Sequence, residues 1–432
     1  MGLRPLRAPP PVLRSEGSRL PPGPFVRGHR SVEQLPIATA KSGPITAFCG
    51  WNASRTTYNA LMAQRVVEDS AELHDVRLEP KLMRTLEKVA PGTALREGLD
   101  AVSQAQTGAL IVVGDPEELA FMFSGGIKLD LDYSPSMLYQ LAKMDGAIII
   151  SANGTKIAWA NVQLLPDPTI SSNETGTRHR TAERVAKQSD AIAICVSQRR
   201  DVVSIYVDAA KYVMVGIPEV LAKANQALAT LDKFRRRFDR ISARLTVQEF
   251  AGRATLHDVL ILFQRAEMIS RMAVEIERFN VELGTEGRLI EMQLEETMIG
   301  VAGEKQGLVR DYIADDSDEH YAQVVDSLAR MSHQDLLDFG RLAELFGYDR
   351  KMNTIDFGVA PRGYRILSRI PRLPKLVIHS ITNEFGGLDA LLDATDSELE
   401  AVEGVGDVRA KEIREGLKRL QEINMVDRYM QT

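Results

Sequence analysis

The chain has 432 residues, more than one ordinary hydrophobic core accommodates, so two to four domains are expected. Its hydrophobic fraction of 44% supports buried cores, and 26% charged residues with a net charge of −6 are typical of a soluble protein. No apolar run approaches the roughly 20 residues that cross a bilayer, and no CxxC or HExxH motif marks a zinc site. Cys49 and Cys195 are far apart, and Cys195 lies in an apolar run, which favours a reducing, cytoplasmic setting and a buried free thiol over a disulfide.

The first 75 residues differ in composition from the rest. Residues 1–61 contain eight Arg or Lys against two Glu, and the first 36 residues hold eight of the 19 prolines. This composition predicts disorder and lacks the apolar stretch of a secretory signal. It superficially suits an organelle transit peptide, but no amphipathic helix is recognisable in it. Because Met62 and Met83 offer alternative starts, we interpret residues 1–75 as a disordered extension or a wrongly assigned start, without chemistry.

From about Pro80 helices and strands are mixed. Residues 79–106 predict two helices broken at 90–93, and residues 134–144 predict a helix capped by Ser134. A helix or turn ending in paired glycines is predicted at 116–126. Strands are predicted at 107–114, 147–151, 156–165, 191–197 and 201–208. The mixture predicts an α/β or α+β domain with a central mixed sheet over residues 82–218.

The strand pattern ends after about residue 215. Apolar residues recur every three or four positions between Leu256 and Leu283, which predicts a long amphipathic helix that packs in a bundle or against another subunit. The basic segment 232–240 before it is interpreted as an exposed helix face. Residues 219–355 are therefore predicted to form an all-α spacer, and residues 361–432 two helical hairpins after a Pro- and Gly-rich boundary.

The second hairpin joins its helices through Gly404-Val405-Gly406. Paired glycines allow a tight turn whose N–H groups can approach a phosphate, and Arg409 and Lys411 follow directly. This pattern resembles the helix-hairpin-helix motif, whose family binds DNA backbones without reading sequence. The first hairpin, with IPRLPK at its turn, resembles a degenerate partner. Alternatively, the glycines only close the hairpin. If the hairpin does bind DNA, residues 382–407, with eight acidic and no basic side chains, predict a modest and salt-dependent affinity.

Residues 171–190 predict a loop followed by a helix with Thr177 or Thr181 near its cap. Arg178, His179 and Arg180 crowd the first turn, where the helix dipole disfavours positive charge by a few tenths of a kcal/mol or more per residue. An anion in front of the helix would explain this placement. The alternative is that the three side chains extend into water.

Two other residues have ordinary and functional interpretations. Asp145-Gly146 lies between a predicted helix and strand, as a common turn does, and equally offers a carboxylate to a divalent cation at the edge of the strand. Ser197 ends a strand, where a hydroxyl is usually structural.

In combination these motifs are more specific. The segments LAKMDGAI (141–148) and GTRHRTAERVAKQSDAIAICVSQRRDVVSIY (176–206) resemble the diadenylate cyclase domain family, with its DGA and RHR motifs, and GALIVVG and FSGG lie where that family has similar segments. With the helical middle and the hairpin end, residues 82–432 resemble the DNA integrity scanning family. The resemblance implies a multi-domain protein: an α/β cyclase domain with a mixed sheet, an all-α spacer and an all-α helix-hairpin-helix domain.

This resemblance also implies a reaction, the condensation of two ATP into cyclic di-AMP and two pyrophosphates. The symmetry of the product favours a two-fold site between protomers, and the family forms octamers. Asp145 would bind Mg²⁺ or Mn²⁺ and orient or deprotonate a 3′-hydroxyl, while Arg178, His179 and Arg180 would hold the triphosphate. Further implied nucleotide contacts are Gly146, Leu164, Thr177, Thr181 and Ser197. Branched or damaged DNA at Gly404, Gly406, Arg409 and Lys411 would lower the activity.

Two other functions stay open at this point. One is a DNA-repair scaffold that binds a nucleotide without turning it over. The other is a nucleotidyltransferase that modifies nucleic-acid ends. The absence of a GxxxxGK[ST] motif counts against a P-loop ATPase in either version.

Overall fold

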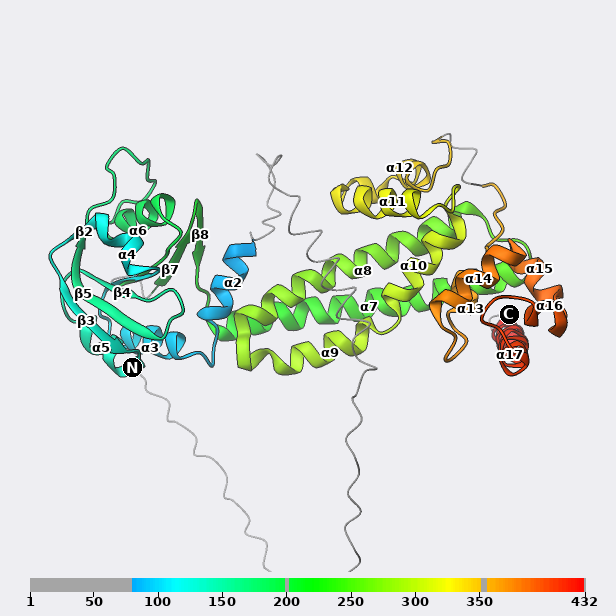
Figure 1. Ribbon diagram of the computed structural model, residues 1–432, viewed down its shortest axis with the longest axis horizontal. Coiled ribbons are helices and arrows are strands. Elements are labelled where there is room, and N and C mark those ends of the chain that lie inside the picture. Colours follow the sequence, from blue (N-terminus) through cyan, green and yellow to red (C-terminus); the bar gives the residue numbers. More distant parts are fainter. Residues whose placement is uncertain (1–79, 199–201, 351–355, 431–432) are drawn as a thin grey trace, which may run out of the picture. The chain divides into compact units, whose positions relative to one another are not determined.

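The structure is a computed structural model that describes residues 80–198, 202–350 and 356–430, with side chains as far as residue 422 (Figure 1). The interpretation of residues 1–75, the thiol of Cys49 and the end of the turn after Ser197 lie outside the described residues. Within the described ranges, three regions follow one another: the first has a core on each face of a sheet, and the other two have one core each.

The first region is built on an eight-stranded sheet of order β2-β5-β4-β1-β6-β7-β8, with β3 also paired to β5. β1 and β4 are parallel and the other pairs antiparallel, so the predicted mixed sheet is confirmed. The strands are β1 Ala109–Val113, β2 Phe123–Ser124, β3 Ile127–Asp132, β4 Ala147–Ile150, β5 Lys156–Leu164, β6 Ile192–Ser197, β7 Val202–Val207 and β8 Ala210–Val213. β3 and β8 were not predicted, and neither was β2, which lies in the segment 116–126 that was predicted to be a helix or turn.

Helices cover both faces of this sheet, because its central strands alternate between two cores. Ile111 and Val113 face α2 Pro80–Lys88, α3 Ala94–Gln104 and α5 Pro135–Leu141. Leu110 and Val112 face α4 Pro116–Leu119, the 3₁₀ turn η1 Ala120–Met122 and α6 Thr177–Gln188. Ser134 caps α5 as predicted, since its Oγ accepts the Met137 N–H at 3.2 Å. The sheet is thus a buried middle layer whose edges carry the loops.

The second region is all-α and shares one core. The predicted amphipathic helix is α8 Leu256–Leu283, which packs along α7 Ile217–Phe250. The remaining elements are η2 Gly284–Gly287, α9 Arg288–Met298, α10 Val301–Tyr312, α11 Asp318–Arg330, η3 Asp335–Leu337 and α12 Phe339–Leu345. Among the described residues, no helix combines the length and apolarity that crossing a membrane requires.

The third region contains α13 Tyr364–Leu367, α14 Lys375–Phe385, α15 Leu388–Asp393, α16 Asp396–Glu400 and α17 Asp407–Met430. Its two helical hairpins repeat with an offset of 32 residues. The left-handed turn residues Arg372 (φ 62°) and Gly404 (φ 85°) correspond under this offset. Core residues correspond as well, in the pairs Leu367/Leu399, Ile370/Val402, Ile378/Ala410 and Ile381/Ile413. The first hairpin therefore has the backbone of the second without its glycines.

Candidate functional site: one edge of the sheet

The predicted nucleotide-contacting residues come from segments far apart in sequence, and the strand directions bring most of them to one edge of the sheet. β1 and β4 are parallel, with Leu110 opposite Ala147, so the turn containing Asp145 lies beside the start of β1. β6 runs antiparallel to β1, with Val196 opposite Ala109, so Ser197 ends at the same edge. Because α6 leads into the start of β6 at the opposite edge, its own N-terminus points back to this one.

Asp145 is exposed, and its carboxylate forms no ion pair or side-chain hydrogen bond with a described residue. The next residue, Gly146, has φ 93°, and a Cβ there would lie 2.8 Å from the backbone carbonyl carbon of Asn161 on β5. Only glycine fits such a close approach in a left-handed conformation. The sequence thus forces a tight turn that holds the carboxylate of Asp145 in solvent at the edge of the sheet.

Helix α6 begins at Thr177, and its cap residue is Gly176, not a threonine, so no side chain accepts the first N–H groups. Arg178 lies over the start of β1, because a Cβ on Gly108 would collide with its guanidinium group. Arg180 is exposed and donates from Nε to the Glu174 carbonyl at 3.3 Å. Open N–H groups and two guanidinium groups at one helix start suit an anion.

His179 is held by a chain of side-chain hydrogen bonds, here called the relay, that runs through Tyr206 to Glu174. Its Nδ1 lies 2.9 Å from the hydroxyl of Tyr206, which donates to Glu174 Oε1 at 3.0 Å. Burial would raise the pKa of Glu174, but hydrogen bonds from Lys211 and Tyr206 outweigh it and lower that pKa. Tyr206 therefore uses its hydroxyl proton to donate a hydrogen bond to the Glu174 carboxylate, so Nδ1 of His179 must be the donor to the hydroxyl oxygen. This fixes the ring tautomer and leaves Nε2 as its second polar atom.

The other predicted residues lie at the same edge with different exposure. Thr177 is exposed and Thr181, one turn later, is half-buried; neither hydroxyl bonds a described residue. Ser197 is half-buried at the end of β6. Leu164 is only 7% exposed and packs in the core beneath α6, whereas its neighbour Leu165 is 58% exposed. Leu164 thus offers little surface to a ligand.

The residues at this edge fit a metal ion whose coordination shell is completed by the substrate. Within the described residues, no three His, Cys, Asp or Glu side chains cluster in a way that would hold a metal ion. Asp145 supplies one unpaired carboxylate. Mg²⁺ commonly binds through one or two carboxylates and takes its other ligands from substrate phosphates and water. Asp145 therefore offers one protein ligand to such an ion.

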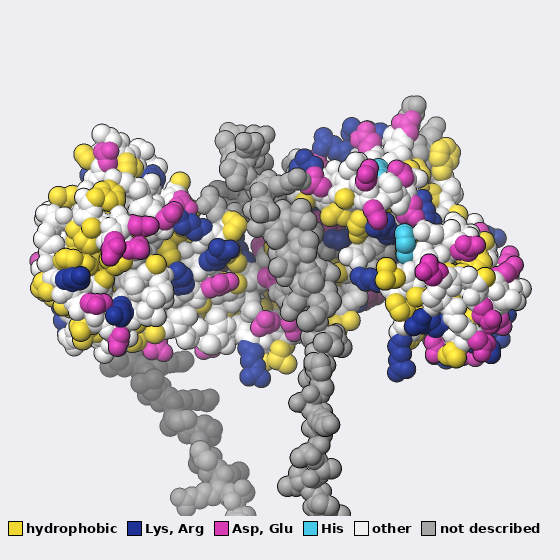
Figure 2. Space-filling view, viewed as in Figure 1, with side chains coloured by type: hydrophobic (Ala, Val, Ile, Leu, Met, Phe, Trp, Pro, Cys, Tyr) yellow, Lys and Arg dark blue, Asp and Glu magenta, His cyan; other side chains and the backbone are white. Residues whose placement is uncertain are grey.

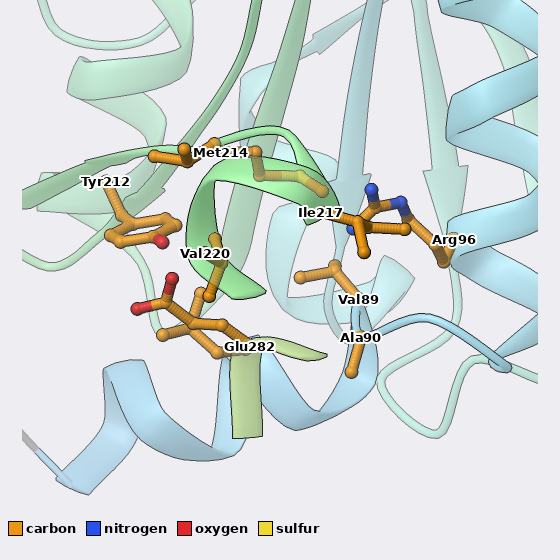
Figure 3. Close-up of a pocket in the computed structure, with 10 residues that line it drawn as sticks. Val89, Ala90, Arg96, Tyr212, Met214, Ile217, Val220 and Glu282 are labelled. Carbon is orange, nitrogen blue, oxygen red and sulfur yellow. The ribbon is translucent and has the colours of Figure 1, made fainter. Parts of the chain in front are cut away.

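The pocket drawn in Figure 3 contains none of these residues. It lies where α2, β8, α7 and α8 meet, with an apolar wall of Val89, Ala90, Met214, Ile217 and Val220. Its polar groups already have partners: Arg96 pairs with Asp100 at 2.8 Å, and Tyr212 is hydrogen-bonded to Glu282. Burial and this bond raise the pKa of Tyr212. The pocket thus marks a junction between the sheet region and the long helices.

The predicted DNA-contacting residues lie at the turn of the second hairpin. Gly404 adopts the left-handed conformation (φ 85°), and Gly406 directly precedes α17. Arg409 donates to the Gly404 carbonyl at 2.6 Å, and Lys411 pairs with Asp407 at 2.6 Å. Acidic side chains are spread over this part of the surface in Figure 2. Both cations are thus engaged by their own hairpin.

Sequence reasoning missed several residues of the sheet edge. Tyr206 gave no signal, because it lies within a strand pattern. Glu174 and Lys211 meet only through the fold. Glu174 did carry a recognisable signal, since an acid five residues before His179 is well placed to fix it. Buried Cys195 is a free thiol as predicted, and burial raises its pKa to about 12.

The chain is thus a multi-domain protein, with an α/β domain followed by two all-α regions. At one edge of its sheet, the α/β domain carries a helix that starts with basic residues and a turn that exposes a carboxylate. These features are typical of the nucleotide-binding class. Comparison with known proteins makes the class specific. The model of the DisA bacterial checkpoint controller nucleotide-binding domain matches residues 96–210, and that of the DisA linker region matches residues 214–355.

Close relatives span most of the chain. DNA integrity scanning protein DisA of Carboxydothermus hydrogenoformans is 47% identical over 344 residues, which is 80% of this chain and 98% of that protein. Its namesake in Symbiobacterium thermophilum is 47% identical over 338 residues, covering 78% of this chain and 95% of that protein. The chain therefore belongs to the DNA integrity scanning protein DisA family, with a nucleotide-binding domain of the diadenylate cyclase class.

Proposed function

We propose that this protein condenses two ATP into cyclic di-AMP and two pyrophosphates at the sheet edge described above. The observation that carries the proposal is the convergence of Asp145, Arg178 and Ser197 on one edge, with the start of α6 open to an anion. The triphosphate of ATP is the anion that this helix start accommodates. Thr177 and Thr181 add hydroxyl donors, and the adenine lies toward the end of β5, against the exposed Leu165, with the buried Leu164 behind it.

In each half-reaction a 3′-hydroxyl attacks an α-phosphorus, its proton leaves, and the bond to the pyrophosphate breaks. Asp145 orients or deprotonates the hydroxyl. A bound Mg²⁺ or Mn²⁺ would supply charge neutralisation on the phosphate oxygens, with Asp145 as its protein ligand. Arg178, His179 and Arg180 hold the phosphates and offset the charge that develops on them. Gly146 lets the turn pass close to β5.

Two protomers are required in this proposal, because the two halves of the product are equivalent. Strands β4 and β6 flank β1, so Asp145 and the end of β6 are separated by about 10 Å within one chain. A second copy that faces the first brings its nucleotide against this edge, so each hydroxyl meets the opposite α-phosphate in line with its leaving group. The proposed assembly is a homo-oligomer, by family resemblance an octamer.

The fate of ATP labelled at its α-phosphate, with and without duplex DNA, tests the proposal against its alternatives. The cyclase predicts label in cyclic di-AMP and release of unlabelled pyrophosphate. A nucleotide-sensing scaffold predicts bound but intact ATP. A nucleic-acid end-modifying enzyme predicts label covalently attached to DNA. Either of the last two results, with folded and oligomeric protein, would refute the cyclase.

Tyr206→Phe is expected to lower turnover about three- to tenfold, because it removes one hydrogen bond that orients His179, worth about 1 kcal/mol. The fold should persist, since Glu174 keeps Lys211 as its partner. Because the relay fixes the ring tautomer, the pH profile of turnover should shift while the KM for ATP changes little. Tyr139→Phe is the matched control, as Tyr139 lies outside the relay. An unchanged rate and pH profile would show that the relay does not position His179.

We further propose that the two hairpins bind the DNA backbone. Although the first hairpin lacks the glycine turn, it supplies more unpaired positive charge than the second. Arg372 and Lys375 flank its turn, are exposed, and form no ion pair with a described residue. Their counterparts in the second hairpin are Gly404 and Asp407, and Asp407 already holds Lys411. Branched or damaged DNA bound here would lower cyclase activity through a change in protomer alignment.

The double variant Arg372→Gln/Lys375→Gln is expected to weaken DNA binding more than Arg409→Gln/Lys411→Gln. Each lost phosphate contact lowers the slope of log K against log salt by about 0.9. The magnitude of this slope should therefore fall by about 2 in the first variant and by clearly less in the second. Fluorescence anisotropy over a salt series measures both slopes. Equal losses would assign the backbone contact to both hairpins alike, and a reversed order would assign it to the glycine turn; either result would contradict the prediction.

A further inference from the structure

Helix α7 carries a basic face that the proposed function does not use. Lys233, Arg237, Arg240 and Arg244, here called the α7 stripe, are all exposed. At 3.6 residues per turn these four positions fall within an arc of about 60° around the helix. The residues that bury α7 in the core of the long helices, such as Phe238 and Leu245, lie on a different side. The stripe is therefore a continuous row of cations along one helix.

The described residues barely neutralise this row. Arg244 approaches Asp258 at 3.4 Å with its side chain 70% exposed, and an exposed ion pair of this kind contributes little. Lys233, Arg237 and Arg240 form no ion pair or hydrogen bond with any residue that the structure describes. The chain as a whole has a net charge of −6, so this group of unpaired cations is a local positive patch on a negatively charged protein.

Helix α8 adds a fifth cation beside the stripe. The guanidinium group of Arg265 lies over the ring of Phe234, 5.3 Å from its centroid. Nε of Arg265 is buried and has no hydrogen-bond partner among the described residues. Burial, and then the nearby charge of Arg237, lower the pKa of Arg265. An anion on this face would relieve the repulsion between the two arginines.

The stripe also runs toward the proposed DNA-binding end. Phe250, the last residue of α7, packs against the core of the hairpin region. At 1.5 Å per residue, Arg244 lies about 9 Å along the helix from Phe250, and Lys233 lies about 17 Å further. That second length corresponds to about five base pairs of a duplex. A row of cations matches the regular spacing of phosphates along DNA better than it matches one small anion.

We propose that the α7 stripe, with Arg265, is a second contact for the phosphate backbone of double-stranded DNA, occupied by a duplex arm that extends from the hairpins. This rests on the proposed DNA binding by the hairpins. Contacts of this kind hold the duplex in position without reading its sequence. The stripe therefore makes affinity depend on arm length.

The test compares two four-way junctions, one with arms of about 20 base pairs and one with arms of about 6, too short to reach along α7. The variant is Lys233→Gln/Arg237→Gln/Arg240→Gln in the full-length chain. The matched control is Lys223→Gln/Arg288→Gln/Arg330→Gln, which removes the same charge from exposed positions elsewhere. Binding is measured over a salt series, and the mass in solution by light scattering.

The expected result is that the unmodified protein and the control bind the long-armed junction at least tenfold more tightly than the short-armed one. The stripe variant should lose this difference, with a slope of log K against log salt smaller by about 2 to 3. Equal behaviour of variant and control would overturn the proposal. A changed mass in solution with unchanged DNA slopes would also overturn it, since the stripe would then join copies of the chain. If the unmodified protein bound neither junction, DNA binding by the hairpins would itself be refuted.

Discussion

Asp145→Asn is expected to abolish formation of cyclic di-AMP, with a loss of about 1,000-fold or more, and to leave the fold intact. The amide has the shape of the carboxylate but neither its charge nor its basicity, so it weakens the proposed metal ligand and removes the proposed base for the 3′-hydroxyl. The fold should persist because the Asp145 side chain is exposed and bonds no described residue. Product formation with ATP and Mg²⁺ or Mn²⁺ measures the effect.

Asp132→Asn is the matched control. Asp132 is an exposed carboxylate of the same domain, at the end of β3, and its side chain also has no bonding partner among the described residues. We expect this variant to keep its activity. Appreciable turnover by Asp145→Asn, or an equal loss in both variants, would contradict the role proposed for Asp145.

Arg365→Met is expected to destabilise the junction between the long helices and the hairpins by about 3–5 kcal/mol. Arg365 is fully buried, and its five N–H groups meet acceptors on α7 and α10. The acceptors are the carboxylates of Glu249 and Glu304 and the hydroxyls of Ser242 and Thr246. Removing the guanidinium group leaves Glu249 as a buried charge without its partner, which is the costly case.

The neighbouring backbone depends on the same junction. Asp311 on α10 accepts the N–H groups of Gly363, Tyr364 and Arg365, which open α13. Burial, with repulsion from Glu249, raises the pKa of Asp311 to about 7. Loss of the Arg365 charge removes the cation that offsets both carboxylates. Amides of α13 and the end of α7 should therefore exchange hydrogen about 100-fold faster or more.

Arg369→Met is the matched control for this prediction. Arg369 contacts the same Ser242, Thr246 and Glu304, but it is 28% exposed, and Glu304 keeps Arg365 in its absence. We expect a cost of about 1 kcal/mol, as for a partly exposed ion pair. Hydrogen exchange that is the same for both variants would show that the buried pair does not hold the hairpins to α7.

Elements buried on both faces were predictable from sequence, and exposed ones were not. β1, β4 and β6 are continuous apolar runs that the fold buries, and α8 has the bounds that its periodicity indicates. β3 was missed because its sequence, IKLDLD, is largely exposed and gains its place by pairing with β5. β8 is a half-exposed edge strand of four residues. Neither carries a hydrophobic signal that burial would require.

The residues of the candidate site could be predicted from sequence, but their proximity could not, because it depends on the strand topology. Asp145, Arg178 and Ser197 were each singled out from local patterns. That they share an edge follows only from the pairing of β1 with β4 and β6. The relay to His179 depends on Tyr206, and the Arg365 junction on Glu249, and both partners are distant in sequence, so no local pattern indicates these contacts.

The identity and stoichiometry of the product test the proposed cyclase reaction directly. Purified protein is incubated with ATP and either Mg²⁺ or Mn²⁺, and the products are identified by mass spectrometry. We expect cyclic di-AMP, with two pyrophosphates released for each molecule formed, and no such product from Asp145→Asn. Intact ATP under both metals, from protein shown to be folded and oligomeric, would contradict it and favour a nucleotide-sensing DNA scaffold.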